Sequence, residues 1–589
     1  MKFCITFCCS ILLFCVSSTH AQFYLRGEVR DDKNQGLANA KIILQSDHML
    51  YYSGVGGGFG LSGSLRQDSI TVMFEGYETM KMRIESGNFL TITLKALSSN
   101  ANKNRPKLIS VTKDKQFTSK FTWHVSDESY FSLVENETVN ARDFPNTGFS
   151  LNVNKASYSN VRRFLKSNSV VPPDAVRCEE LLNYFNLNYS EPDPGDYFKI
   201  TSNLSPCPWK SGSHLLYLNV NARKIDLQKI PPSNLVFLID ASGSMDMPNR
   251  LPLVKAAFQL LVKNLRPIDT VSIVIYGGTV AVWMEPTSGA EKEKIIRSIE
   301  ELTALGDTPG ESAIRLAYRT AQRSFIPAGN NRVIIATDGD FNVGEVSEKA
   351  LEELVARERQ SGVYLTCLGV GMGNFKDSKL EALAKKGNGN YAYLDDIGEA
   401  EKVLVKEMTQ TFFTVANDVY LNVQFNPAVA KDYRLIGFDN RKDAIADSTG
   451  DLEGGEIGSG NSVLAIFELT LAPGVTIPEG DVARVKLRYK PAELKTEKSI
   501  SYACSAVVTP FSTLNKDLQF GAAVAMFGLK LRQSKYIPPT VNWSDIEKLA
   551  TEARNPGSYL QSGFISLLSS AKKVYGDGKS KKRKKKEEE

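Results

Sequence analysis

The 589-residue sequence predicts a multidomain α/β protein in which a doubly wound sheet is inserted into a β-sandwich. Strand and helix patterns alternate between residues 232 and 415, which is typical of parallel strands joined by right-handed crossovers. Short strand patterns without helices stand on both sides of this stretch, at 196–225 and 417–510. We therefore expect one sandwich built from both sides of the inserted domain, preceded by a small N-terminal β-sandwich and followed by a helical segment.

The first 21 residues are predicted to be a secretory signal peptide. Lys2 precedes an apolar run of 14 residues, from Phe3 to Val16, and Ala21 offers a cleavage site. A membrane-spanning helix is disfavoured because a bilayer requires about 20 apolar residues. Attachment of a lipid at Cys15 is also disfavoured, because Phe14 stands where a small residue is expected. The mature chain has no second run long enough to span a membrane, so it is expected in the periplasm or at the cell surface.

Residues 22–97 are predicted to form the small β-sandwich, because short strand patterns alternate with turn residues. The strand patterns are Leu25–Val29, Lys41–Leu44, Ile70–Phe74 and Leu90–Leu94. The stretch GEVRDDKNQGLANAKI, which begins at Gly27, resembles the carboxypeptidase-regulatory-like modules of exported bacterial proteins. This resemblance implies a spacer or docking module. Residues 98–119 are polar and are predicted to be a linker.

Residues 120–231 are predicted to flank the inserted domain, 232–415 to form it, and 416–577 to complete the sandwich and add helices. The flanking region has helix patterns at 156–166 and 174–185 and strand patterns at 197–202 and 214–221. The inserted domain has strand patterns at 235–240, 270–277, 332–339, 363–371 and 391–396, and helix patterns at 253–264, 292–302, 312–324, 349–360 and 378–386. Strand patterns then follow at 419–425, 462–471, 482–489 and 500–509, and helix patterns at 518–533, 543–554 and 559–575. The charged tail, 578–589, is predicted to be disordered.

Four cysteines remain after removal of the signal peptide: Cys178, Cys207, Cys367 and Cys504. An exported protein can form disulfides, and four thiols allow three complete pairings. However, Cys367 lies in an apolar strand pattern and Cys178 lies on the apolar face of a helix pattern. We therefore expect buried free thiols.

The charge of the folded part is balanced. Lys2, seven basic residues at 579–586 and three glutamates at 587–589 account for the formal net charge of +5, and 63 basic and 63 acidic residues remain. A folded part with no formal net charge gives no indication of nucleic-acid binding.

The segment Leu235–Met245, LVFLIDASGSM, carries the main candidate site. Four aliphatic residues and one aromatic residue lead into Asp240, and oxygen-bearing side chains then follow at alternate positions, Ser242 and Ser244. Such a run is typical of a strand buried on both faces of a parallel sheet, and ligands bind beyond the carboxyl ends of those strands. Taken alone, the pattern also fits an ordinary turn in which a serine caps the helix that begins near Leu251.

Two further segments add oxygen ligands at the predicted end of the sheet. Thr308 lies in the loop Gly306–Gly310, and Asp338 ends the strand pattern RVIIATDGD. Two carboxylates and three hydroxyls, without Cys or His, favour Mg²⁺ or another hard cation such as Mn²⁺ or Ca²⁺ over Zn²⁺.

At these residues the sequence resembles the von Willebrand factor A (VWA) family, whose domain is Rossmann-like. The resemblance implies a metal-ion-dependent adhesion site (MIDAS). Ser242, Ser244 and Thr308 would contact the metal directly, whereas Asp240 and Asp338 would hold it directly or through water. The family leaves one coordination position for an acidic side chain of a protein partner.

The resemblance extends to a bacterial subgroup, the YfbK-like proteins, over roughly residues 118–575. It is carried by TDGDFNVG at 337–344, NVRRFL at 160–165 and EELLNYF at 179–185. A role in protein–protein interaction in the cell envelope is expected, and the sequence leaves open whether the protein is an adhesin or an assembly factor.

Two enzyme classes compete with this interpretation. A phosphotransferase of the haloacid dehalogenase type also places an aspartate after a strand and uses Mg²⁺, but it requires a second aspartate where this chain has Ser242. A serine hydrolase is disfavoured because no Gly-x-Ser-x-Gly surrounds either serine and His48, His124 and His214 are distant in sequence. We therefore expect a protein without catalytic residues.

Overall fold

The structure is a computed structural model of the whole chain. It describes residues 23–95 and 128–576, except 39, 47–49, 55, 64, 75–76, 86–88, 129, 131–132, 134, 227–229, 305, 307–309, 340–347, 373–374, 439–454, 474–479 and 495. The predicted signal peptide, linker and charged tail therefore lie outside the described residues. Contacts divide the chain into two compact units, with the boundary near residue 117.

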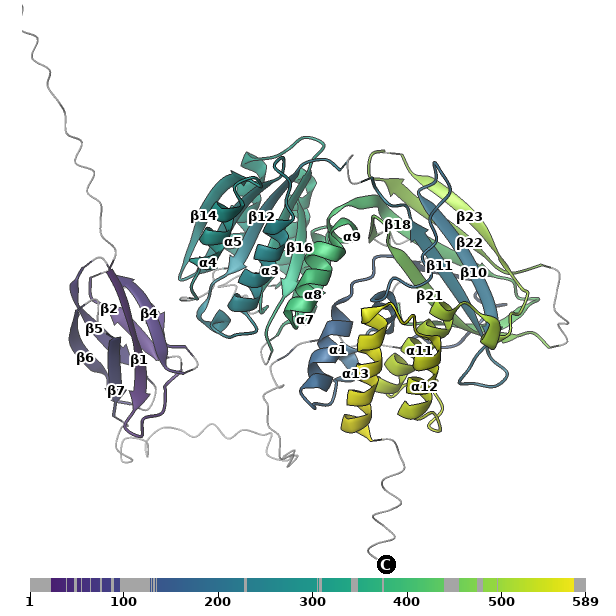
Figure 1. Cartoon of the computed structure of the whole chain (residues 1–589), viewed down its shortest axis with the longest axis horizontal. Coiled ribbons are helices and arrows are strands. Elements are labelled where there is room, and N and C mark those ends of the chain that lie inside the picture. Colours follow the sequence, from purple (N-terminus) through teal and green to yellow (C-terminus); the bar gives the residue numbers. More distant parts are fainter. Residues whose placement is uncertain are drawn as a thin grey trace, which may run out of the picture. The chain divides into compact units, whose positions relative to one another are not determined.

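The N-terminal unit is a sandwich of two sheets with strand orders β4–β1–β7 and β3–β2–β5–β6 (Figure 1). The strands are β1 (Phe23–Asp31), β2 (Lys41–Leu44), β3 (Leu50–Tyr52), β4 (Gly58–Gly63), β5 (Gln67–Met73), β6 (Met80–Glu85) and β7 (Phe89–Leu94). Alternate apolar residues such as Val29, Ile42 and Ile92 are buried between the sheets because successive side chains of a strand point to opposite faces. The predicted small β-sandwich is confirmed, although β3, β4 and β6 were not predicted.

The second unit contains a six-stranded sheet of order β14–β13–β12–β15–β16–β17, in which only the β13–β14 pairing is antiparallel. The strands are β12 (Ser233–Asp240), β13 (Thr270–Gly277), β14 (Thr279–Ser288), β15 (Asn330–Thr337), β16 (Tyr364–Gly369) and β17 (Tyr391–Tyr393). Helices α3 (Leu251–Lys263) and α4 (Lys292–Glu300) share a core with Phe237, whereas α5 (Gly310–Arg323), α6 (Glu348–Glu358) and α7 (Asp377–Lys386) share one with Leu238. Both faces of the sheet are therefore covered, as expected of a doubly wound fold (Figure 1).

The strands on either side of this sheet in the sequence form a second sandwich. One sheet has the order β10–β11–β21–β19–β8, and the other has the order β20–β18–β22–β23 with β9 also paired to β18. The strands are β8 (Val139–Asn140), β9 (Asn146–Ser150), β10 (Phe198–Pro206), β11 (His214–Ala222), β18 (Thr414–Phe425), β19 (Ala430–Ile436), β20 (Gly455–Gly458), β21 (Ser462–Leu471), β22 (Asp481–Pro491) and β23 (Lys498–Ser505). Because β11 pairs directly with β21, the predicted insertion of the doubly wound sheet into a β-sandwich is confirmed.

A layer of helices packs against the β21 sheet. It comprises α1 (Ala156–Lys166), α2 (Cys178–Asn183), α11 (Lys516–Leu531), α12 (Trp543–Ala553) and α13 (Tyr559–Tyr575). Helix α2 is shorter than predicted, because Pro173–Ala175 form a separate 3₁₀ turn and Arg177 has an extended backbone. All four cysteines of the described part are buried and outside any disulfide, as predicted. None of the described helices combines the length and the apolar character that crossing a membrane requires.

Ion pairs with little exposure to solvent join the inserted domain to the segment that precedes it. Arg162 on α1 binds Asp395 and, at 2.7 Å, Glu399. The Nζ atom of Lys155 lies 3.0 Å from a carboxylate oxygen of Glu407. Charged groups out of solvent require such partners, so these contacts fix the domain against the flanking helices.

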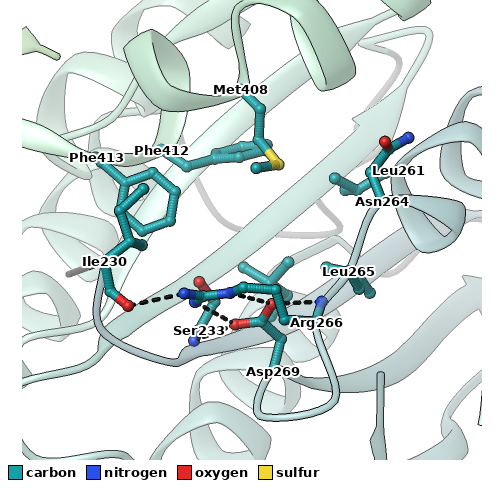
Figure 2. Close-up of a pocket in the computed structure, with 11 residues that line it drawn as sticks. Ile230, Ser233, Leu261, Asn264, Leu265, Arg266, Asp269, Met408, Phe412 and Phe413 are labelled. Atoms are coloured by element: carbon teal, nitrogen blue, oxygen red, sulfur yellow. Dashed lines mark hydrogen bonds and ion pairs between the residues drawn. The ribbon is translucent and has the colours of Figure 1, made fainter. Parts of the chain in front are cut away.

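The chain enters and leaves the inserted domain beside a mainly apolar pocket of about 170 Å³ (Figure 2). Ile230 comes from the incoming segment, and Met408, Phe412 and Phe413 come from the outgoing one. The guanidinium of Arg266 donates to the carbonyl of Ile230 at 2.8 Å and pairs with Asp269 at 2.8 Å, as Figure 2 shows. Both crossings, the points at which the chain enters and leaves the inserted domain, therefore lie at the start of β12. Asp240 is at the opposite end of this strand.

Candidate metal-binding site

Asp240 and Asp338 lie together at the carboxyl end of the parallel sheet. β12 pairs with β13 on one side, where Asp240 is opposite Tyr276, and with β15 on the other. Asp240 ends β12, and Asp338 follows β15 directly. The exposed fractions of the two side chains are close to zero. The fold thus brings together two carboxylates that are 98 positions apart in the sequence.

The loop after Asp240 presents both predicted serine hydroxyls. The backbone N–H of Ser242 donates to Oδ1 of Asp240 at 2.9 Å, and the Oγ atoms of Ser242 and Ser244 are 3.1 Å apart. The end of β13 lies directly against this loop, because Gly277 has φ +136° and a Cβ there would lie 2.3 Å from the carbonyl carbon of Ala241.

Neither serine caps the helix that follows. The residue that precedes α3 is Arg250, and its side chain makes no capping hydrogen bond. The interpretation of the motif as an ordinary capped turn is therefore wrong.

Thr337 is a site residue that the sequence patterns did not single out. Its hydroxyl donates to Oδ2 of Asp240 at 2.7 Å and accepts from the backbone N–H of Gly339 at 3.0 Å. Both oxygens of Asp240 therefore accept a hydrogen bond from the protein. The available signal was the position of Thr337 immediately before Asp338, at the end of a strand adjacent to β12.

Burial and like charge dominate the electrostatics of the pair. Burial and, after it, the nearby charge of Asp338 together raise the pKa of Asp240 to about 7, against the hydrogen bonds from Ser242 and Thr337. Burial also raises the pKa of the Tyr276 phenol, and the charge of Asp240 adds to that shift. Two buried carboxylates at close range favour a cation between or beside them.

Arg250 is a second residue that the patterns missed. Its guanidinium pairs with Asp338 at 2.7 Å. It also donates to the carbonyl of Ser244 and, at 2.9 Å, to the carbonyl of Met372. Arg250 thereby joins three loops at this end of the sheet. Its position just before α3 carries no spacing signal that would have identified it.

The described residues fit a small hard cation. Neighbouring oxygens of an octahedral site with bonds of 2.0–2.1 Å are about 3 Å apart, which matches the separation of the two serine hydroxyls. Within the described part of the chain, no group of three or more His, Cys, Asp or Glu side chains could hold a metal, so a thiolate or imidazole site is absent there. Thr308, the fifth predicted ligand, lies outside the described residues.

Family models cover most of the second unit. Residues 234–406 match the von Willebrand factor type A domain, residues 410–574 match the C-terminal part of uncharacterized protein YfbK, and residues 124–217 match a model described as von Willebrand factor.

Uncharacterized protein YfbK of Escherichia coli strain K12 is 38% identical over 468 residues, which cover 74% of this chain and 80% of YfbK. Human inter-alpha-trypsin inhibitor heavy chain H4 is 31% identical over 149 residues, which cover 24% of this chain and 16% of the heavy chain. Among solved structures, a von Willebrand factor type A protein from Catenulispora acidiphila has a TM-score of 0.38 at 16% identity, over 65% of this chain and 90% of its own.

Proposed function

Because the chain belongs to the YfbK-like group of the von Willebrand factor A family, we propose that it is an exported, non-enzymatic protein that binds a partner protein through a divalent metal ion. The metal ligands are Ser242, Ser244 and Thr308, with Asp240 and Asp338 acting directly or through water. Mg²⁺ is the expected ion, with Mn²⁺ or Ca²⁺ as substitutes. The place of action is the periplasm or the cell surface.

The observation that carries the metal assignment is the arrangement of Asp240, Asp338 and the two serines. Two buried carboxylates stand beside two hydroxyls that are spaced as adjacent octahedral ligands. When bound, a divalent ion supplies a position at which an acidic side chain of the partner completes the coordination. The chain's own residues position that ion: the hydrogen bonds of Ser242 and Thr337 orient the carboxylate of Asp240.

The non-enzymatic role rests on the groups around the site. Asp240 is followed at the second position by Ser242, whose side chain cannot replace the acid/base aspartate of a haloacid dehalogenase. The contacts of Asp240 and Asp338 described above come from Ser242, Thr337 and Arg250, and none of these is a histidine.

The test uses the mature chain, residues 22–589, and its Asp240→Ala variant. Calorimetric titration with Mg²⁺, Mn²⁺ and Ca²⁺ should show binding to the wild type and not to the variant. Both proteins are also immobilised and exposed to envelope extract. The wild type should retain a partner that chelator releases, and the variant should retain none. Absence of metal binding by the wild type would contradict the proposal, and Mg²⁺-dependent hydrolysis of p-nitrophenyl phosphate that Asp240→Ala abolishes would favour the phosphotransferase instead.

A further inference from the structure

The guanidinium of Arg250 is a buried part of the candidate site. Arg250 is 6% exposed and Asp338 is 1% exposed, so their ion pair of 2.7 Å lies out of solvent. The guanidinium also lies directly against the backbone at Gly371, where a Cβ atom would be 2.5 Å from Nε of Arg250. The side chain is thus held between the loop after β12, the end of β15 and the loop after β16.

A cation beside the two buried carboxylates stabilises this end of the sheet even without a metal. Asp240 and Asp338 are both buried, and two like charges out of water repel each other strongly unless a counter-ion is close. Arg250 supplies that counter-ion from within the chain. A divalent metal that binds the same carboxylates must share Asp338 with the guanidinium, and the two cations repel each other.

We propose that Arg250 is a built-in counter-ion that keeps the metal site assembled when no metal is bound and, by competing for Asp338, weakens the affinity of the site for the metal. Arg250 is a positioning residue, because it acts through Asp338 and the loop carbonyls. The effect on metal affinity (the affinity half of the proposal) rests on the proposed function. The effect on assembly without metal (the assembly half) does not. With metal bound, the guanidinium leaves the site net positive, which favours an anionic partner group.

The test compares three variants of the mature chain. Arg250→Gln removes the charge and retains an amide that can donate to the loop carbonyls. Arg250→Lys retains the charge but loses the planar guanidinium, which donates from two nitrogens at once. Arg250→Gln combined with Asp338→Asn removes both members of the ion pair. The measurements are the melting temperature in chelator and the dissociation constants of Mg²⁺ and Mn²⁺ from calorimetry.

Arg250→Gln should melt at a lower temperature than the wild type in chelator, yet bind Mg²⁺ about tenfold more tightly, because a nearby positive charge is gone. Arg250→Lys should keep a dissociation constant within about twofold of the wild type, because the positive charge remains, but should lose part of the melting temperature, because an ammonium group cannot reproduce the directed contacts of the guanidinium. The double variant should recover melting temperature relative to Arg250→Gln, because the charge of Asp338 beside Asp240 is removed as well, and should not bind metal more tightly than the wild type.

Arg266→Gln is the matched control. Arg266 also pairs with a buried aspartate, Asp269, and also donates to two loop carbonyls, but it lies at the opposite end of β12. It should lower the melting temperature without changing the dissociation constant of the metal.

Metal affinity that is unchanged or weaker in Arg250→Gln would overturn the affinity half of the inference. A double variant no more stable in chelator than Arg250→Gln would overturn the assembly half. If no protein of the series, wild type included, binds Mg²⁺ or Mn²⁺, the proposed function and the affinity half both fail, whereas the melting temperatures in chelator still decide the assembly half.

Discussion

Thr337 donates a hydrogen bond of 2.7 Å to the carboxylate of Asp240, from the end of a strand that is 97 positions away in the sequence. Replacement of Thr337 by Val, which has the same shape, should leave this buried oxygen without its donor. We expect a loss of about 1–3 kcal/mol in the free energy of unfolding, measured by urea denaturation in chelator. Thr320→Val, which removes a buried hydroxyl bonded to the Leu316 carbonyl within α5, is the control, and an equal loss there would show that the contact with Asp240 has no special role.

Asp240→Ala should fold and should lose the stabilisation that metal provides. In the wild type, a metal concentration of 100 times the dissociation constant should add about 2.7 kcal/mol by mass action. The measurement is the melting temperature with and without millimolar Mg²⁺. Asp193→Ala, at an acid whose side chain is 76% exposed, should respond as the wild type does. A full response in Asp240→Ala would rule out this aspartate as a ligand.

The sandwich should not fold without the strands that precede the inserted domain. β21 lies between β11 and β19, so a fragment of residues 417–510 lacks one neighbour of that strand along most of its length. The fragment should show no cooperative thermal transition by circular dichroism, whereas residues 128–576 should melt cooperatively. A cooperative transition of the short fragment would mean that β10 and β11 are dispensable.

Cys367 should react with a thiol reagent only after denaturation. It is fully buried in β16, between strands β15 and β17, and burial raises the pKa of its thiol. The thiolate, which is the reactive form, is therefore scarce as well as inaccessible. Mass spectrometry of the labelled native protein should show no modification at this position, and Ser512→Cys, at an exposed site, should be labelled at once. Rapid native labelling of Cys367 would be incompatible with the buried strand.

The stability of the second unit should fall as the pH rises from about 4.5 to about 7. Burial raises the pKa of Glu456 from 4.5 to about 7, although Arg332 opposes this shift. The folded protein therefore retains a proton that the unfolded chain has released, and the contribution is complete below pH 4.5 and lost above 7. A shift of this size corresponds to an effect on the order of 3 kcal/mol.

The measurement for Glu456 is the free energy of unfolding at pH 5 and pH 8 for the wild type and Glu456→Gln. The variant keeps a neutral side chain at all pH values, so its stability should fall less over this interval. Equal falls in the two proteins would assign the pH dependence to other groups.

The parts of the fold that the sequence predicted well have strong local patterns. Helices α1 and α13 have the predicted bounds because their apolar residues recur at the helical period, and β21 has its predicted bounds because it contains a continuous apolar run. Short strands such as β8 and β20 were missed. They have two and four residues, and their hydrogen bonds come from strands far away in the sequence. Edge strand β14 was missed because its side chains alternate poorly between buried and exposed.

The candidate site shows the same division between local and long-range information. Asp240, Ser242 and Ser244 were identified because one short segment contains all three. Arg250 and Thr337 act through side-chain contacts across loops and strands, and no spacing in the sequence reveals such contacts. The position of a hydrogen-bond partner is determined only when the strands are placed in register.

The location of both chain crossings at the start of β12 has a mechanical consequence. A pull on a partner held near Asp240 would run along β12 to the crossings beside Ile230 and Phe413, at the other end of the strand. β12 is hydrogen-bonded in parallel to β13 on one side and to β15 on the other. Tension between the two ends of β12 would run through its own backbone, and sliding β12 out of the sheet would shear both ladders of hydrogen bonds at once. The two ladders therefore hold β12 in place against a pull on the proposed metal site.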